Sequence, residues 1–305
     1  MQHERKRLRI GIAFSGGISK CAYQLGFTKA LLRYVDRSEI TAISGSSMGF
    51  FSAYALSANK IDRLEWIYRK IDVEKPRDLV YQIAVKGMLV KLIDYYVGPE
   101  DVLEIPMCFP VCYFPILSTR YYWIKDEYNP AWKKYIQGAT NFPGLYLKPL
   151  FKHGRYMLDG GASDNIPIYP LINYPKLYKE EPLDLIIALH FDARYDNRRY
   201  FNDSVPILDL DVTIANDFRK DHFNFSAEYA NEMLERGEEY GEQICKKLFT
   251  GDCSREGLKK KIGDIFLEEH DRREQNSSVD ALFSMINILG RTFRSKSSDC
   301  FKKLY

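Results

Sequence analysis

The sequence predicts an α/β protein with a mostly parallel central sheet and a helical extension at its carboxyl end. Between Arg9 and Ala58, short apolar runs alternate with segments of helical spacing, as at the start of a parallel sheet with crossover helices. A second apolar run, Leu183 to Phe191, has the continuous hydrophobicity of a strand covered on both faces. From Ile207 onward we expect the chain to be mostly helical and increasingly charged.

The first strand and helix are predicted from apolar spacing and from the turn between them. Residues Arg9 to Phe14 form a short apolar run that stops at Ser15-Gly16-Gly17, which is typical of a buried strand followed by a tight turn. Apolar and aromatic side chains then recur at helical spacing, at Tyr23, Phe27, Ala30, Leu31 and Tyr34. This spacing predicts a helix packed against the sheet.

The next elements follow at once. Ile40 to Ser44 is predicted to be a strand, Gly45 to Gly49 a turn, and Phe50 to Ala58 a buried helix. Between Ile61 and Val97 the amphipathic pattern predicts helices that cover the site as a cap. Prolines punctuate the aromatic run from Phe109 to Tyr122, which is expected to contain strands.

The rest of the chain predicts one further strand at Arg155 to Leu158 and a helical end. Gly251 to Ser278 is polar, and Val279 to Leu289 is predicted to be an apolar helix. It precedes a basic tail that contains Arg291, Arg294, Lys296, Lys302 and Lys303. Because no repeat or low-complexity linker interrupts the chain, we expect one α/β domain over residues 1–250 and a helical extension over residues 251–305, packed on or near that domain.

Length and composition exclude several classes of protein. The chain has 305 residues, of which 46% are hydrophobic and 28% charged, so it is neither fibrous nor wholly disordered. Its 44 basic and 41 acidic residues nearly balance, and we expect no nucleic-acid partner. The six cysteines form no C-x-x-C pair, which favours reduced thiols.

The apolar segments also bear on location. No uncharged apolar run reaches the roughly 18 residues that a membrane-spanning helix needs. The start of the chain is basic and lacks the apolar region of a signal peptide. We therefore expect a cytoplasmic chain with peripheral membrane contact, or one exported by a route that reads no such peptide.

The clearest chemical motif is Gly45-Ser46-Ser47-Met48-Gly49, which matches G-x-S-x-G between a predicted strand and a predicted helix. A nucleophile on such a sharp turn exposes its Oγ, and glycines two residues away on each side avoid collisions. The start of the following helix also stabilises developing negative charge. Ser47 is therefore the candidate nucleophile.

The turn Ser15-Gly16-Gly17-Ile18 presents backbone N–H groups at the carboxyl edge of the sheet. It lacks the glycine spacing of the phosphate-binding motifs. An oxyanion hole requires only free N–H groups beside a nucleophile, and neighbouring turns of one parallel sheet provide that. A turn with a purely geometric role is the remaining alternative.

The base that would activate Ser47 has two possible arrangements. In one, Ser47, an acid such as Asp159 and then His190 follow the chain order of a catalytic triad. In the other, Asp159 acts directly on Ser47 from the turn Asp159-Gly160-Gly161, which requires a short Ser-Asp hydrogen bond and a strong oxyanion hole. The residues alone leave both open.

Three segments read together resemble the patatin-like phospholipase family. They are Phe14-Ser15-Gly16-Gly17-Ile18-Ser19-Lys20-Cys21, the Ser47 pentapeptide, and Asp159-Gly160-Gly161-Ala162-Ser163-Asp164-Asn165-Ile166-Pro167. They occur in the family's order, with thirty positions between Gly17 and Ser47. The resemblance covers Arg9 to about Phe191, and Gly138 to Gly144 is similar to the family's small-residue loop.

This resemblance implies a three-layer α/β/α catalytic domain and a Ser-Asp dyad of Ser47 and Asp159. It implies an oxyanion hole formed by the backbone of Gly16, Gly17 and Ile18. The implied reaction is calcium-independent hydrolysis of acyl esters in phospholipids or other lipids, of phospholipase A or lysophospholipase type, with no cofactor. The chain departs from the family pattern at Ile18 and Cys21, which stand in place of glycines.

Other functions fit the same residues. An acyltransferase would use the same dyad, a Ser-Asp-His esterase would use His190, and a catalytically silent membrane-binding module would use neither. The basic tail beyond Val279 is a candidate contact with anionic head groups, which attract exposed Lys and Arg side chains.

Overall fold

The computed structural model describes residues 7–73, 78, 81–83, 86–127, 129–142, 150–192, 205–213 and 224–276. The chain forms two compact units, Met1–Ile262 and Gly263–Tyr305. Helix α9 (Arg255–Asn276) crosses the boundary between them. Everything that positions the candidate site belongs to the first unit.

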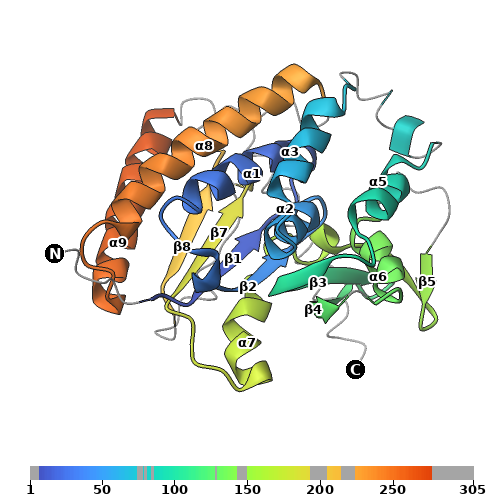
Figure 1. Ribbon diagram of the computed structural model, residues 1–305, viewed down its shortest axis with the longest axis horizontal. Coiled ribbons are helices and arrows are strands. Elements are labelled where there is room, and N and C mark those ends of the chain that lie inside the picture. The colour runs from blue at the N-terminus through green and yellow to red at the C-terminus, as the bar shows by residue number, and fades with distance from the viewer. Residues whose placement is uncertain are drawn as a thin grey trace, which may run out of the picture. The chain divides into compact units, whose positions relative to one another are not determined.

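A mostly parallel sheet forms the centre of this unit (Figure 1). Its strands lie in the order β5-β6-β3-β2-β1-β7-β8, and β4 pairs with β3. Strands β3, β2, β1, β7 and β8 are parallel, while β4, β5 and β6 form the antiparallel end. The strands are β1 (Ile10–Phe14), β2 (Ile40–Gly45), β3 (Val102–Phe114), β4 (Ser118–Glu127), β5 (Leu150–Lys152), β6 (Arg155–Asp159), β7 (Leu185–His190) and β8 (Ile207–Asp211).

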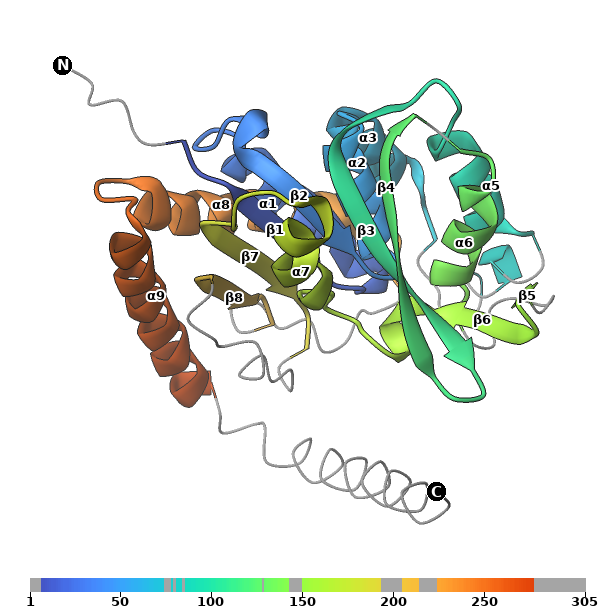
Figure 2. The same cartoon turned by 90° about the horizontal axis from the view of Figure 1, so that it is seen from below.

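Helices cover both faces of the sheet, which confirms the predicted α/β class. Helices α1, α2, α3 and α8 lie on one face and α7 lies on the other (Figures 1 and 2). Every residue of β1 and β7 is buried, as expected for strands between two helical layers. The helices of this unit are α1 (Cys21–Leu31), α2 (Gly49–Ser57), α3 (Ile61–Lys70), α5 (Met88–Tyr96), α6 (Trp132–Ala139), α7 (Tyr169–Tyr178) and α8 (Ala227–Phe249).

The contact between α1 and α8 is unusually close because glycines line it. A Cβ added to Gly26 would lie 2.0 Å from the carbonyl oxygen of Leu234, and one added to Gly237 would lie 2.1 Å from that of Tyr23. Only glycine allows the two backbones to approach this far. The long helix α8 is thereby held against the helix that follows the glycine turn.

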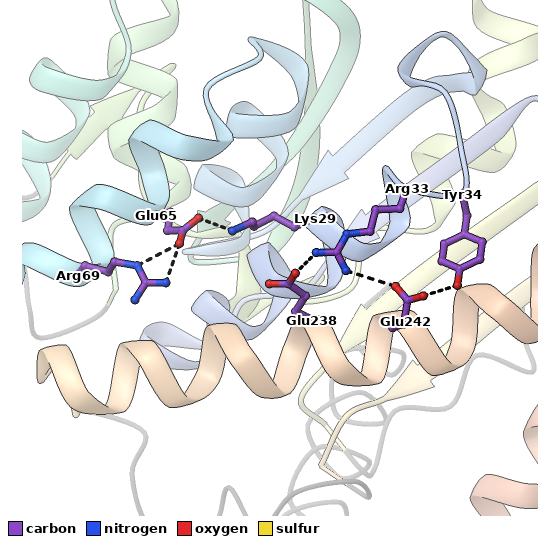
Figure 3. A network of polar contacts seen from close by, with 7 residues as sticks. All are labelled: Lys29, Arg33, Tyr34, Glu65, Arg69, Glu238 and Glu242. Carbon is purple, nitrogen blue, oxygen red and sulfur yellow. Dashed lines mark hydrogen bonds and ion pairs between the residues drawn. The ribbon is translucent and has the colours of Figure 1, made fainter.

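Polar contacts join the same helices at their surface (Figure 3). Glu65 on α3 accepts hydrogen bonds from Lys29 of α1 at 2.8 Å and from Arg69 at 2.7 Å. Just beyond α1, Arg33 pairs with Glu238 and Glu242 of α8, and the Tyr34 hydroxyl donates to Glu242. Charged groups thus connect three helices of one layer around an apolar interior.

The later chain contains one strand that was not expected. It was predicted to be mostly helical from Ile207 onward, and helices α8 and α9 agree with this, but residues Ile207–Asp211 form strand β8 at the edge of the sheet. Leu208 and Leu210 alternate with Asp209 and Asp211, which suits an edge strand beside β7. The predicted helix Val279 to Leu289 and the basic tail lie outside the described residues. Within the described part of the chain, no helix is both long and apolar enough to cross a bilayer.

Candidate active site

Ser47 occupies a sharp turn between β2 and α2, as its motif predicts. Its φ is +53°, in the left-handed region that a side chain adopts at some cost in free energy. The flanking glycines are required by close contacts. A Cβ on Gly45 would lie 2.4 Å from the carbonyl oxygen of Gly49, and one on Gly49 would lie 2.4 Å from that of Ser15. The G-x-S-x-G spacing therefore allows the strand, the turn and the helix to pack together.

Strand β3 brings Asp159 to Ser47. At both Met107 and Val111, one side of β3 is occupied by β4, so β2 and β6 must share its other side. Strand β2 pairs there in parallel, as far as Cys108, and β6 pairs antiparallel from Val111 onward. Strands β2 and β6 therefore run toward each other along the same side of β3. Their carboxyl ends are separated by the short interval of β3 between Cys108 and Val111.

The two candidate catalytic side chains meet at this interval. Ser47 Oγ donates a hydrogen bond to Asp159 Oδ2 at 2.7 Å, and the N–H of Gly161 donates to Asp159 Oδ1 at 2.7 Å. Burial raises the pKa of Asp159 to about 6, against the opposing effects of these two hydrogen bonds. A carboxylate with a raised pKa is a stronger base than an ordinary aspartate and remains largely ionised at neutral pH.

The glycine turn lies directly against Ser47. A Cβ on Gly16 would be 2.7 Å from Ser47 Cβ, and one on Gly17 would be 2.3 Å from the Phe191 ring. The N–H of Gly16 is directed at Asn165, with its backbone oxygen at 3.3 Å and Oδ1 at 3.1 Å. Among the described residues, the N–H of Ile18 has no such acceptor, and the N–H of Gly17 interacts with the thiol of Cys21, where it opposes the rise in thiol pKa that burial causes.

Ile18 adopts a conformation that is rare for a β-branched residue. Its φ is +55°, in the region that glycine occupies freely. It is one of the positions where the sequence departs from the family's glycines. The chain thus keeps the left-handed turn despite the side chain, and strain of this kind clusters at functional sites.

His190 lies at the end of β7, as predicted, but it does not complete a triad. Its Nε2 is 3.0 Å from Asp209 Oδ1, and its Nδ1 accepts a hydrogen bond of 3.3 Å from the N–H of Asp192. Strand β1 separates β7 from the strand that leads to Ser47. Although burial opposes it, the contact with Asp209 raises the pKa of His190. Both ring nitrogens are engaged by Asp209 and Asp192, and neither contacts Ser47 or Asp159.

Two pockets, which differ in polarity, meet at Ser47 and Asp159. Ile18, Ser47, Phe142 and Asp159 line both of them. One is a polar cleft of about 530 Å³, bordered also by Lys20, Asn165 and Asp192. The other is a narrow apolar pocket of about 30 Å³ beneath α3 and α5, lined by Ile71, Ile83, Met88, Leu89, Leu92 and Phe225.

Comparison with known families gives a match for the region that contains Ser47. Residues 12–87 match the family model described as patatin-like phospholipase. This region of the chain is patatin-like. The match agrees with the resemblance for the first two of the three sequence segments, and it supports a lipid hydrolase as the broad class of function. The matched range includes the glycine turn and Ser47 and ends before Asp159.

Two solved structures are similar to the chain. They are VipD from Legionella pneumophila, with 11% identity and a TM-score of 0.42, and the type III effector protein ExoU, with 12% identity and a TM-score of 0.37. The first comparison covers 92% of this chain and 79% of VipD, and the second covers 85% of this chain and 54% of ExoU. No curated protein sequence matches the chain at a significant level.

Sequence reasoning assigned no role to two asparagines of the candidate site. Asn165 holds Gly16 from both sides, because its Nδ2 also donates to the carbonyl oxygen of Gly16 at 3.3 Å. Asn141 supports the strand of the candidate base: its Nδ2 donates to the carbonyl of Met157 at 2.7 Å, and its own carbonyl accepts from the N–H of Asp159 at 2.9 Å. Both asparagines lie in segments that carry the family resemblance, and this was the one sign in the sequence that they could have a role in the site.

Proposed function

We propose that the chain is a lipid acyl hydrolase of phospholipase A or lysophospholipase type that works through an acyl-Ser47 intermediate. The hydrogen bond of 2.7 Å between Ser47 Oγ and Asp159 Oδ2 carries this proposal. It supplies the nucleophile and base contact that covalent ester hydrolysis needs, without an imidazole. The patatin-like match around Ser47 supports the same class of reaction.

In the acylation step, Ser47 Oγ attacks the ester carbonyl carbon while its proton passes to Asp159 Oδ2. The N–H groups of Gly17 and Ile18 would stabilise the negative charge on the carbonyl oxygen. Gly16, the third residue expected in the oxyanion hole, contributes by anchoring the turn through Asn165. The intermediate then collapses, the carbon–oxygen bond to the alcohol breaks, and that alcohol takes the proton from Asp159.

Deacylation repeats these steps with water. A water molecule attacks the acyl-Ser47 carbonyl and gives a proton to Asp159, and the collapse of the second intermediate releases the fatty acid and returns the proton to Ser47 Oγ. Asp159 is therefore base and acid in turn, which suits a pKa of about 6.

The two pockets support an amphipathic substrate. An acyl chain would occupy the apolar pocket and the head group the polar cleft, with the ester between them at Ser47. Because the apolar pocket holds only about 30 Å³, its lining side chains must move apart to admit a chain. Met88 and Leu92 of α5 are the flexible candidates for this movement.

The test is release of free fatty acid from a mixed panel of phospholipids and lysophospholipids in the presence of a chelator. We expect wild type to release fatty acid and both Ser47→Ala and Asp159→Asn to lose it. Loss of about a hundredfold to ten-thousandfold is expected for Asp159→Asn, the range for removal of a general base. Asp164→Asn, a neighbouring buried carboxylate outside the dyad, is the matched control.

The same assay separates the other functions. His190→Asn should retain most activity, and its complete inactivity with the fold intact would instead indicate a Ser-Asp-His esterase. Transfer of the acyl group to an added alcohol or lysolipid in preference to water would indicate an acyltransferase. Absence of turnover on every lipid, together with intact lipid binding, would leave a silent membrane-binding module.

A further inference from the structure

Exposed apolar side chains gather where two hairpins turn at one end of the sheet. The exposed fraction is 70% for Ile116, 51% for Leu117 and 45% for Phe114, all beside the turn between β3 and β4. Phe151 and Tyr156 flank the turn between β5 and β6 and are similarly exposed. Clustered exposed apolar groups of this size mark interaction sites.

The two turns form one continuous surface, which we call the tip surface and define as residues 114–120 and 150–156. Tyr156 pairs with Phe114 on one side and with Phe151 on the other, with ring centroids at 6.4 Å and 3.8 Å. The Arg155 guanidinium also donates to Ser118 Oγ at 3.4 Å, which joins the two hairpins.

The tip surface lies on the same edge of the sheet as the dyad. Asp159 pairs with Val111 of β3, and Phe114 lies three residues further along the same strand. At the usual rise of a strand, that distance is about 10 Å. Figure 2 shows the hairpin of β3 and β4 extending well past the ends of β1, β2 and β7. A flat surface that approached this edge would meet the tip surface beside the site.

The charge of the tip surface has a single sign. Its two segments contain Arg120, Lys152 and Arg155 together with His153, and no aspartate or glutamate. Arg120 is exposed, and Lys152 and Arg155 are partly exposed. Apolar side chains surrounded by basic ones match a bilayer with anionic lipids, in which the apolar groups enter the interface and the cations meet the head groups.

We propose that the tip surface docks the protein on the surface of an anionic lipid bilayer, with the dyad facing that surface. This inference rests on the proposed function in one respect, because lipid hydrolysis is the reason for the protein to bind a bilayer. The residues that support it are separate from Ser47 and Asp159. A second copy of this chain fits less well, because a symmetric contact between two tip surfaces would bring basic groups against basic groups.

The test measures binding to vesicles in a Ser47→Ala background, so that no lipid is consumed. Vesicles of phosphatidylcholine alone and of phosphatidylcholine with phosphatidylserine are sedimented with the protein. We expect the double variant Ile116→Ser, Leu117→Asn to lower partition onto both vesicles by about tenfold or more, because both side chains lose their apolar contact. The variant Arg120→Gln, Lys152→Gln should lower only the preference for phosphatidylserine.

Leu177→Asn is the matched control, since this leucine is 59% exposed near the end of α7, before the chain enters β7 at the opposite edge of the sheet. It should bind vesicles as the parent does. With Ser47 intact, all these variants should hydrolyse a soluble short-chain ester at unchanged rates, which shows that the dyad is undisturbed.

Equal vesicle binding by the tip double variant and by Leu177→Asn would overturn the proposal. A change in oligomeric state on size-exclusion chromatography, with vesicle binding unaffected, would assign the tip surface to a protein partner and also overturn it. If wild type hydrolyses neither the soluble ester nor any lipid, the proposed function fails, while the vesicle comparison still decides the role of the tip surface.

Discussion

At the scale of single residues, the chemistry depends on one buried carboxylate. Asp159 is 2% exposed, and its two oxygens receive hydrogen bonds from Ser47 and Gly161. Burial shifts its pKa upward to about 6, so this side chain changes its charge just below neutral pH. Both catalysis and stability should therefore depend on pH through Asp159.

The first prediction concerns catalysis. Only the ionised carboxylate can take the Ser47 proton, so kcat/KM should fall about tenfold per pH unit as the pH drops below about 6. The measurement is kcat/KM on a soluble ester between about pH 4 and pH 8. The fall should persist in His190→Asn. If the fall in kcat/KM at low pH disappears in that variant, the titrating base is the imidazole and not Asp159.

The second prediction concerns stability. An aspartate whose pKa is raised in the folded state binds its proton more tightly there than in the unfolded chain, so stability declines as the pH rises from about 4 to about 6. Asp159→Asn removes this cost and should stabilise the protein at pH 7 by about 2–3 kcal/mol, a magnitude that follows from a shift of about two pKa units. Urea unfolding at pH 4 and pH 7 measures it. A gain of equal size at both pH values would contradict the assignment.

The third prediction concerns Asn165, a positioning residue for the glycine turn. Asn165→Ala removes the side-chain contacts to Gly16 and should lower kcat by about tenfold to a hundredfold, with KM little changed, because the oxyanion donors lose their alignment. Asn173→Ala is the control, since this partly exposed side chain donates a hydrogen bond to the carbonyl of Tyr169 in its own helix. A rise in KM with kcat unchanged would indicate a role in binding instead.

The residue scale also shows the limit of sequence reasoning about the site. Ser47 was predictable, because its turn requires glycines at fixed positions. Asp159 could be chosen over His190 only through the family resemblance, since nothing local reveals that β6 meets the end of β2 while β7 lies beyond β1. The contact between Asn165 and Gly16 joins residues 149 positions apart and has no local signature.

At the scale of elements, the close contact of α1 and α8 gives the fourth prediction. In Gly237→Ala the new methyl group would meet backbone and not a flexible side chain, so the helices must separate. We expect a loss of about 1–3 kcal/mol in the free energy of unfolding, the usual cost of overpacking. Gly263→Ala, with no atom within 4 Å of the added Cβ, should be neutral or slightly stabilising. Equal midpoints of thermal unfolding would contradict the close contact.

Elements with one strong periodicity were predicted well, and those defined by distant partners were not. The spacing of Tyr23 and Phe27 predicted α1, and the run before Ser15 predicted β1. Strand β8 was missed because its five residues are flanked by helix-like and polar sequence, and its pairing with β7 has no local signal. Pro110 lies within β3 opposite Tyr121 of β4, in the interval where neither β2 nor β6 pairs with the other side of the strand, and its place inside a strand had no signal in the local sequence.

At the scale of the whole molecule, the fifth prediction concerns the boundary between the two units. The first compact unit extends to Ile262, and Lys261 Nζ donates to the carbonyls of Leu248 and Thr250 at 3.0 Å and 2.8 Å, at the end of α8. A chain that ends at residue 262 should fold with nearly the full thermal midpoint. A chain that ends at residue 250 should melt several degrees lower, because α8 loses these contacts. Identical thermal midpoints for the two truncated chains would place the end of the α/β domain at residue 250, as predicted from the sequence.

The arrangement of β2 and β6 on β3 has a consequence for reading other sequences. Ser47 and Asp159 follow or end strands that do not pair with each other, and the stretch of β3 from Cys108 to Val111 sets the separation of these two candidate catalytic side chains. One residue inserted there would displace Asp159 from Ser47 by about 3.4 Å and leave all three motifs intact. A sequence can therefore contain every recognisable motif and still lack a working dyad, and the length of an unremarkable segment of a third strand decides which case applies.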